Sequence, residues 1–230
     1  ALDVPTNDLR LVVPPDRRSL YTVAPLAYYL RATVELGSDP RVVTPSGRLA
    51  LGEDRSFEDD VAHLLRSTLL VDAVVRGETP VARRVAERDP VEAALPTDLE
   101  SLHEGPDHER LLAAAALPAD VVAEHGPRWP VTAHLPDDPE HLEVLPFLAA
   151  ELAIVRSPRA SGIDPGSLAS TASATAVAES AATAGPDDLE LVDPADPDGA
   201  VERAWFGEGV AISGTTASIA GYRNDLAASP

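Results

Sequence analysis

The 230-residue chain contains no cysteine, no methionine and no glutamine, and all 18 of its basic residues are arginine because lysine is absent as well. Without cysteine there is no thiol nucleophile, thiolate-bound zinc, iron–sulfur cluster or disulfide. Without lysine there is no Schiff base and no phosphate-loop lysine. No apolar run reaches 18 residues, so the sequence predicts no membrane-spanning segment and no membrane partner.

What the chain has in excess is negative charge. Asp and Glu number 38 against 18 arginines, which gives a formal net charge of -20. Nucleic acid is an unsuitable partner, because a phosphate backbone is bound through clustered Arg and Lys. At molar salt the Debye length falls to about 3 Å, so the self-repulsion of these charges is largely screened. A hyperthermophilic origin would enrich lysine along with glutamate, so the composition instead favours a salt-adapted protein.

The same composition suggests a location and a history for the chain. No charged segment followed by an apolar stretch opens the sequence, so no secretion signal is visible. The chain begins with Ala1 and contains no Met, which predicts that it is processed or cut from a larger protein. We therefore expect a cytoplasmic protein of a high-salt cytosol, whose acidity reflects the solvent and indicates no substrate.

Apolar spacing predicts a mixture of strands and helices in the first 75 residues. Strands are predicted over Leu9–Val13, Thr33–Leu36 and Arg41–Thr44, and a helix over Leu20–Arg31 with Ser19 as its cap. The clearest helix runs from Phe57 to about Val75, and Ser56 with Asp59 forms its capping box. Prolines then split short helical stretches between about 80 and 125, which predicts a small helical subdomain.

The second half begins with an alternating strand pattern and ends in a different composition. Trp129–Leu135 is predicted as a strand, followed by a helix that Asp138 caps and that ends near Arg156. Residues 157–188 are rich in Ala, Ser and Thr, with a low-complexity run over 170–184, which predicts a flexible linker. The remaining segment, 189–230, contains Trp205 and a predicted helix near Thr215–Ala227, and we expect it to dock on the main domain.

These patterns predict an α/β or α+β protein with a small sheet, several helices and a helix-rich middle. The expected organisation is a main domain over 1–156, which includes the helical subdomain, then the linker over 157–188 and the docking segment over 189–230.

Histidines and acids form the densest group of possible metal ligands. The segment His103–Glu109 carries two histidines, and His134 and His141 flank a Pro-Asp-Asp-Pro-Glu turn further along. His103, His108, His134 and His141 are therefore the candidate ligands of a zinc or manganese ion. Gly and Pro interrupt the helix that a His-Glu-x-x-His site needs, so a solvated acidic loop is the simpler interpretation of the first segment.

No catalytic residue and no cofactor-binding residue is indicated. The sequence has neither a Gly-x-Ser-x-Gly elbow nor a Gly-x-Gly-x-x-Gly fingerprint. His63 and Asp72 are nine residues apart on the long helix, so they face nearly opposite sides and are interpreted as ordinary half-exposed residues. Tyr21, Tyr28 and Tyr29 cluster on the first helix, where a boundary between core and surface is favoured over a ligand platform.

Three stretches resemble a family of uncharacterised haloarchaeal proteins: LVVPPDRRSLYTVAPLAYYL at Leu11–Leu30, WPVTAHLPDDPEHLEVLPFLAAELAIVRS at Trp129–Ser157 and AWFGEGVAISGTTASIAGYRNDL at Ala204–Leu226. In that family this region precedes a C-terminal domain similar to CHAT domains, which have a caspase-like fold. The resemblance implies that a caspase-like domain of the same protein is a partner of this region. The His–Cys pair of that domain has no counterpart in this cysteine-free chain.

Three functions stay open on the sequence. The first is a non-catalytic accessory or regulatory domain of a larger haloarchaeal protein, favoured by the missing catalytic motifs. The second is an enzyme or binding domain that uses a metal or small ligand through the His103–Glu109 segment. The third is a protein-interaction module that uses the helix carrying Tyr21–Tyr29.

Overall fold

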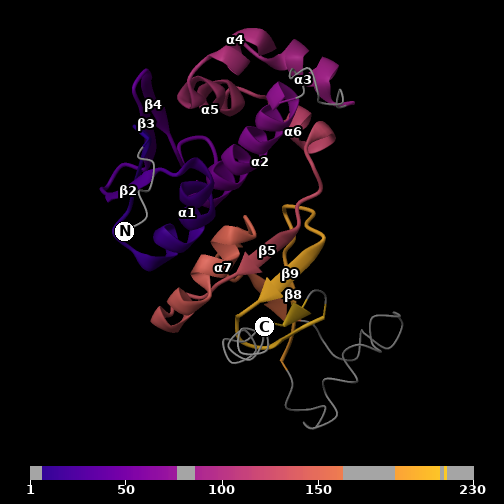
Figure 1. Cartoon of the computed structure of the whole chain (residues 1–230). Helices are drawn as coiled ribbons and strands as arrows, with labels where there is room; N and C mark the ends of the chain where they lie inside the picture. The colour runs from indigo at the N-terminus through magenta and orange to yellow at the C-terminus, as the bar shows by residue number, and fades with distance from the viewer. Residues whose placement is uncertain (1–6, 77–85, 163–189, 213–214, 217–230) are drawn as a thin grey trace, which may run out of the picture. The chain divides into compact units, whose positions relative to one another are not determined.

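The computed structural model describes residues 7–76, 86–162, 190–212 and 215–216 (Figure 1). Its internal contacts divide the chain into unit 1, Ala1–Arg128, and unit 2, Trp129–Pro230, and each is described by itself. Helices and three small sheets make up the described residues, which confirms the predicted mixture of α and β structure. Within the described residues, no helix is long and apolar enough to cross a membrane.

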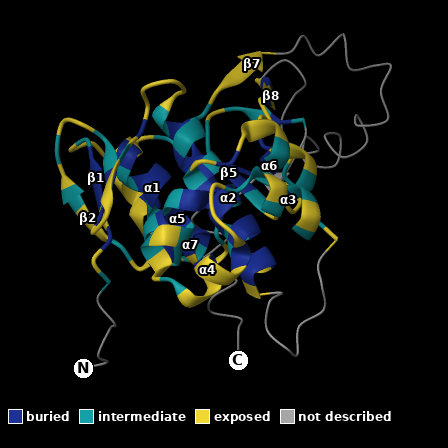
Figure 2. Cartoon of the chain, turned by 90° about the horizontal axis from the view of Figure 1, so that it is seen from above, coloured by how far each residue is buried: buried dark blue, intermediate teal, exposed yellow. Residues whose placement is uncertain are grey.

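Unit 1 contains a four-stranded sheet in the order β2-β1-β3-β4. Its strands are β1 (Arg10–Val13), β2 (Thr33–Leu36), β3 (Arg41–Thr44) and β4 (Gly47–Ala50). Helix α1 (Arg17–Leu30) connects β1 to the parallel strand β2, as a parallel pair requires, whereas β3 runs antiparallel to β1 and β4. The predicted strands are confirmed. β2 and β3 are not neighbours, because β1 lies between them. Three of the four residues of β1 are buried, and Figure 2 shows this strand largely in the colour of buried residues.

The two long helices of unit 1 begin at side-chain caps. The carboxylate of Asp16 accepts a hydrogen bond from the backbone N–H of Ser19 at 2.8 Å, so α1 begins one turn earlier than predicted and includes Pro25. Helix α2 (Phe57–Arg76) matches its prediction, and the hydroxyl oxygen of Ser56 accepts from the backbone N–H of Asp59 at 3.1 Å. Such caps satisfy N–H groups that have no partner within the helix.

Four short helices pack around the second half of α2 and form the predicted helical subdomain. They are α3 (Arg88–Ala94), α4 (Leu99–Glu104), α5 (Asp107–Ala115) and α6 (Ala119–His125). Their shared core contains Val71 and Val74 of α2 with Leu102, Ala114 and Val122 of the short helices, all 4% exposed or less. This core fixes α4 and α5 beside α2.

Unit 2 contains a parallel sheet in the order β11-β9-β5-β6. Its strands are β5 (Val131–His134), β6 (Ile154–Arg156), β9 (Glu202–Trp205) and β11 (Thr215–Thr216). The 3-10 helix η1 (Pro139–Glu143) and helix α7 (Leu145–Ala150) connect β5 to β6. A second sheet has the order β10-β8-β7, from β7 (Ala160–Gly162), β8 (Leu191–Pro194) and β10 (Val210–Ala211).

Several predictions for the second half differ from this arrangement. The predicted end of this helix near Arg156 is wrong, because α7 stops at Ala150 and Ile154–Arg156 forms β6, the last strand in the order of the parallel sheet. The predicted main domain, 1–156, differs from the division after Arg128, because β5 pairs with β6 on one side and with β9 on the other.

The predicted linker and tail overlap with described strands. β7 lies in the first part of the predicted linker, and residues 163–188 lie outside the described residues. The helix predicted near Thr215–Ala227 begins instead with the strand β11, and its remaining residues are also outside the described part. The described part of 189–230 contributes β8, β9 and β10 to the sheets of unit 2.

Candidate functional site: a polar pocket in unit 1

A pocket of about 330 Å³ lies within unit 1, a volume at the lower end of the range that small-molecule sites occupy. Its polar lining comes from four helices. Tyr29 lies on α1, Asp72 on α2, His103 on α4 and Arg110 on α5. The lining also includes Leu9, Leu30, Arg31, Thr68, Val75, Arg76 and Asp107. The pocket therefore combines apolar and charged lining residues.

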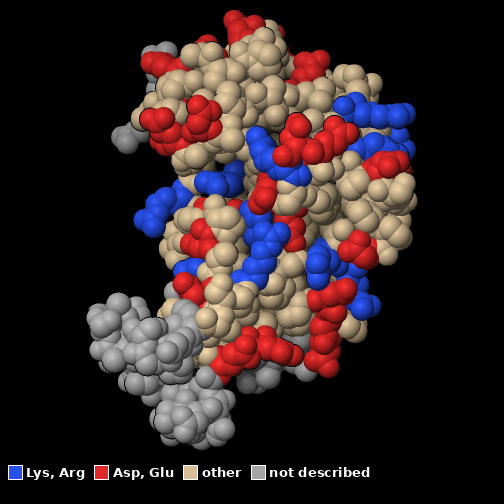
Figure 3. Space-filling view, turned by 180° about the vertical axis from the view of Figure 1, so that it is seen from behind, with Lys and Arg blue, Asp and Glu red and all other residues tan. Residues whose placement is uncertain are grey.

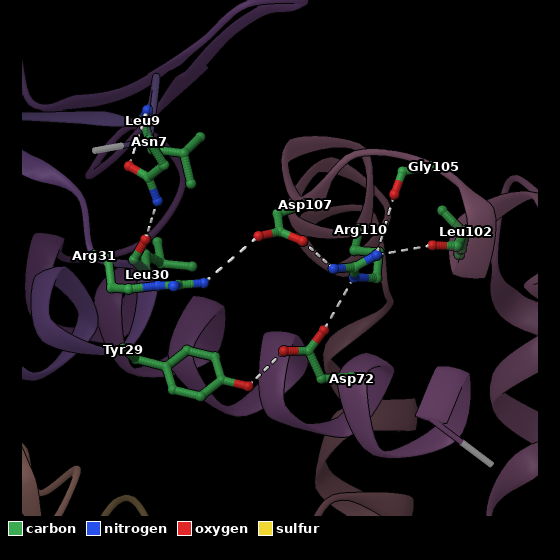
Figure 4. Close-up of polar contacts among 10 residues, drawn as sticks. All are labelled: Asn7, Leu9, Tyr29, Leu30, Arg31, Asp72, Leu102, Gly105, Asp107 and Arg110. Carbon is green, nitrogen blue, oxygen red and sulfur yellow. Dashed lines mark hydrogen bonds and ion pairs between the residues drawn. The ribbon is translucent and has the colours of Figure 1, made fainter. Parts of the chain in front are cut away.

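The hydroxyl of Tyr29 is held by the carboxylate of Asp72. It donates a hydrogen bond to Asp72 Oδ2 at 2.5 Å (Figure 4). Burial raises the pKa of Tyr29 well above its usual value of 10, and the hydrogen bond to the Asp72 carboxylate raises this pKa further. The hydroxyl therefore stays protonated at neutral pH and ties α1 to α2.

Arg110 connects the same carboxylate to the next two helices. Its Nε lies 3.4 Å from Asp72 Oδ1, and its Nη1 donates to the carbonyl oxygens of Leu102 at 3.1 Å and Gly105 at 3.3 Å. These carbonyls belong to the end of α4, where backbone acceptors have no partner within the helix. Its Nη2 donates to Asp107 Oδ1. Each guanidinium nitrogen thus has a partner, and the group connects α2, α4 and α5.

Asp107 lies between two arginines (Figure 4). Its Oδ1 accepts from Arg110, and its Oδ2 lies 3.8 Å from Nη2 of Arg31 at the end of α1. Arg31 differs from Arg110 in that its side chain is 57% exposed and, within the described residues, its guanidinium makes no ion pair besides this one. The network Tyr29–Asp72–Arg110–Asp107–Arg31 thus begins at the hydrogen bond between Tyr29 and Asp72. It ends at the guanidinium of Arg31, which is largely exposed to solvent.

The charges of the pocket have the opposite sign to the charge of the chain. Three arginines, Arg31, Arg76 and Arg110, line it together with two acids, Asp72 and Asp107, whereas the chain as a whole carries a formal charge of -20. Figure 3 shows Asp and Glu side chains in several groups over one face, with arginine side chains between them. The lining thus carries one more positive than negative charge, on a chain whose total charge is strongly negative.

The histidines of the predicted metal site lie in different places. His103 is exposed on α4 and lines the pocket. The Nε2 of His108 lies 2.8 Å from the hydroxyl oxygen of Ser46, which is in the turn between β3 and β4. His134 and His141 belong to unit 2. Within the part of the chain that the structure describes, no group of three or more histidines and acids could hold a metal ion.

His134 and His141 are buried at the carboxyl edge of the parallel sheet in unit 2. His134 is 1% exposed and its ring centroid lies 5.6 Å from that of Trp205, while His141 contacts Phe206 edge to face at 5.7 Å. Neither ring nitrogen of His134 has a hydrogen-bond partner among the described residues. Burial, and then the charge of Arg203, lower the pKa of His134 below 6.5, so the ring is neutral in the folded unit.

The tyrosines of α1 do not form one exposed patch. Tyr21 is 1% exposed and belongs to the core of unit 1, whereas Tyr28 is 59% exposed. Tyr29 points into the pocket (Figure 4). The predicted boundary between core and surface describes Tyr21 and Tyr28 only, because Tyr29 lines the pocket.

The residues that build the pocket were mostly missed from the sequence. Its position on the long helix predicts Asp72 to be an ordinary half-exposed residue, and no pattern in the sequence marks Arg31 or Arg110 as functional. The i,i+3 spacing of Asp107 and Arg110 was a usable signal for one pair. The bond between Tyr29 and Asp72 joins residues from two helices and has no local signature. No protein-family model, curated protein or solved structure matches the chain.

Proposed function

We propose that the chain is a non-catalytic accessory or regulatory module that binds a small polar ligand in the pocket of unit 1. The observation that carries this proposal is the continuous polar network along the wall of a pocket large enough for a small molecule. Small-molecule sites combine an apolar lining with a few polar groups whose positions are fixed. Here the apolar lining comes from Leu9, Leu30 and Val75, and the fixed polar groups come from the network.

A binding role suits the network better than a catalytic one. Its acids are each held by an arginine or a tyrosine hydroxyl, whereas a nucleophile is activated by a base beside it. By its resemblance to the haloarchaeal family, the module would serve a larger cytoplasmic protein with a caspase-like domain. Ligand occupancy in the pocket would then be the signal that the module passes to its partner domain.

The test is a search for ligands with a variant that fills the pocket. Thermal melts at one fixed molar KCl concentration would compare a panel of sugars, amino acids, nucleosides and organic anions. His103→Trp places a large ring in the pocket lining, and Glu104→Trp makes the same change at the neighbouring exposed residue outside it. We expect at least one compound to raise the melting temperature of the wild type and of Glu104→Trp, with little effect on His103→Trp. A panel without any hit, or equal shifts in the two variants, would contradict the proposal.

A further inference from the structure

Given the proposed binding role of this pocket, we infer that its ligand is an organic anion whose carboxylate or phosphate group replaces Asp107 as the partner of Arg31. The starting observation is that a carboxylate of the chain itself already lies between two guanidinium groups of the pocket wall (Figure 4). An anionic ligand of the same chemistry would find the same complementary groups.

The two arginines differ in how readily they can accept a new partner. Arg110 has an exposed fraction of 21%, and each of its three guanidinium nitrogens already has a carbonyl or carboxylate partner. Arg31 holds Asp107 at 3.8 Å, which is longer than a hydrogen bond, and both side chains are more than half exposed. Such a pair contributes little to stability, so an incoming anion can displace Asp107 from Arg31 while Asp107 keeps its bond to Arg110.

The backbone at Arg31 supports the same assignment. Arg31 has a φ of 52°, in the left-handed region, and forms the C-terminal cap of α1. Helices commonly end with a residue in this conformation, and glycine adopts it most readily. An arginine in this conformation carries a strain that glycine would not, and strained residues occur preferentially at ligand sites. Here the residue in this conformation carries a guanidinium that lines the pocket and is 57% exposed.

The remaining lining sets the kind of anion. Leu9, Leu30 and Val75 give the pocket an apolar wall beside the charged one, which an inorganic ion would leave uncovered. An anion with a small apolar body fits both walls. Benzoate and phenyl phosphate have this form, and benzamide has the same shape as benzoate without the charge.

The experiment measures the binding of these three probes by titration calorimetry at constant ionic strength. We expect benzoate or phenyl phosphate to bind the wild type and benzamide to bind at least about tenfold more weakly, since one charge-assisted hydrogen bond is worth that much. The comparison of benzoate with phenyl phosphate decides between carboxylate and phosphate as the recognised group.

Two variants should change the affinity in opposite directions. Arg31→Gly removes the guanidinium and suits the left-handed backbone, so we expect a loss of about tenfold or more in affinity without a lower melting temperature. Asp107→Asn removes the competing charge and keeps an oxygen for Arg110, so we expect tighter binding. Arg10→Ala and Glu35→Gln are the matched controls, because these residues form an exposed ion pair at 3.3 Å outside this pocket.

The outcomes separate this inference from the proposed function. Equal binding of benzamide and benzoate, unchanged affinity in Arg31→Gly, or no tighter binding in Asp107→Asn would overturn the anion assignment. The same holds if none of the three probes binds while a neutral or cationic compound of the panel binds in a manner that His103→Trp abolishes. In that last case the pocket remains a ligand site for a neutral or cationic molecule.

Discussion

The ion pair between Arg156 and Asp198 in unit 2 allows a sharp prediction about stability. Arg156 Nε and Nη2 each donate to a different oxygen of Asp198 at 2.7 Å, and the side chains are 5% and 3% exposed. The hydroxyl of Thr132 on β5 also donates to Asp198 Oδ2 at 3.4 Å. Replacing Asp198 with Ala therefore leaves a buried guanidinium without its carboxylate, at the end of β6.

The expected loss is large because both groups are buried. Two unit charges about 4 Å apart at an effective dielectric constant of about 20 interact by about 4 kcal/mol. Removal of one member of a buried pair typically costs about 3–5 kcal/mol, since the other charge stays desolvated. The matched control is Asp196→Ala, which breaks a pair with Arg203 at 3.7 Å whose side chains are 23% and 18% exposed. We expect it to cost about 1 kcal/mol.

The assay is urea unfolding at constant KCl, followed by tryptophan fluorescence. Trp129 and Trp205 are the only tryptophans of the chain, and both are buried in unit 2, so the signal reports this unit alone. A loss of less than about 1 kcal/mol in Asp198→Ala, or a loss no greater than that of Asp196→Ala, would refute the reasoning. The double replacement Arg156→Met with Asp198→Leu should recover most of the stability, because it removes both charges together.

Three further predictions concern pH, packing and salt. Burial and the charge of Arg203 lower the pKa of His134. The neutral ring therefore contributes its full stability to unit 2 above about pH 6.5, and this contribution is lost as the pH falls from 6.5 toward the folded-state pKa. Urea melts above and below pH 6.5 should show this loss of stability, and His134→Phe should flatten the pH dependence. Gly207→Ala places a Cβ 2.4 Å from Cζ2 of the buried Trp205 ring. We therefore expect this substitution to destabilise unit 2 by about 1–3 kcal/mol in the fluorescence assay. An unchanged urea midpoint would contradict this contact. The formal charge of -20 predicts a melting temperature that rises as KCl shortens the Debye length from about 10 Å at 0.1 M to about 3 Å at 1 M, and equal circular-dichroism midpoints would contradict salt adaptation.

Local patterns were sufficient to predict most of unit 1. The alternation in Arg41–Thr44 and the apolar stripe of Phe57–Arg76 depend on neighbours within a few residues, so the sequence indicates them directly. The order of the strands is not local information, which is why β1 was not expected between β2 and β3. The apolar run Ile154–Arg156 follows a helix without a glycine stop, and only its pairing with β5 identifies it as a strand.

The pocket was harder to predict than the fold because its residues are ordinary in type and distant in sequence. An aspartate on a long helix is usually a solvated residue, and Asp72 differs only because Tyr29 and Arg110 converge on it from other helices. Histidine clusters are conspicuous in a sequence, yet Ser46 rather than an acid contacts His108, and His134 is covered by an aromatic ring. His108 and His134 are thus of a residue type that indicates a metal site in a sequence, but in the structure they make other contacts.

The strand order of unit 2 has a consequence for how the chain acquires its structure during synthesis. The whole sheet of unit 1 is encoded before Leu51, whereas β5 must wait for β9, so that Val131 meets Glu202 only after a long intervening segment has been made. Until then the edge of β5 has free backbone groups beside Thr132 and Ala133, which are fully buried in the finished unit. Closing so long a loop is slow. A ribosome-bound chain should therefore carry a finished first unit while the second still exposes an edge that other chains can join.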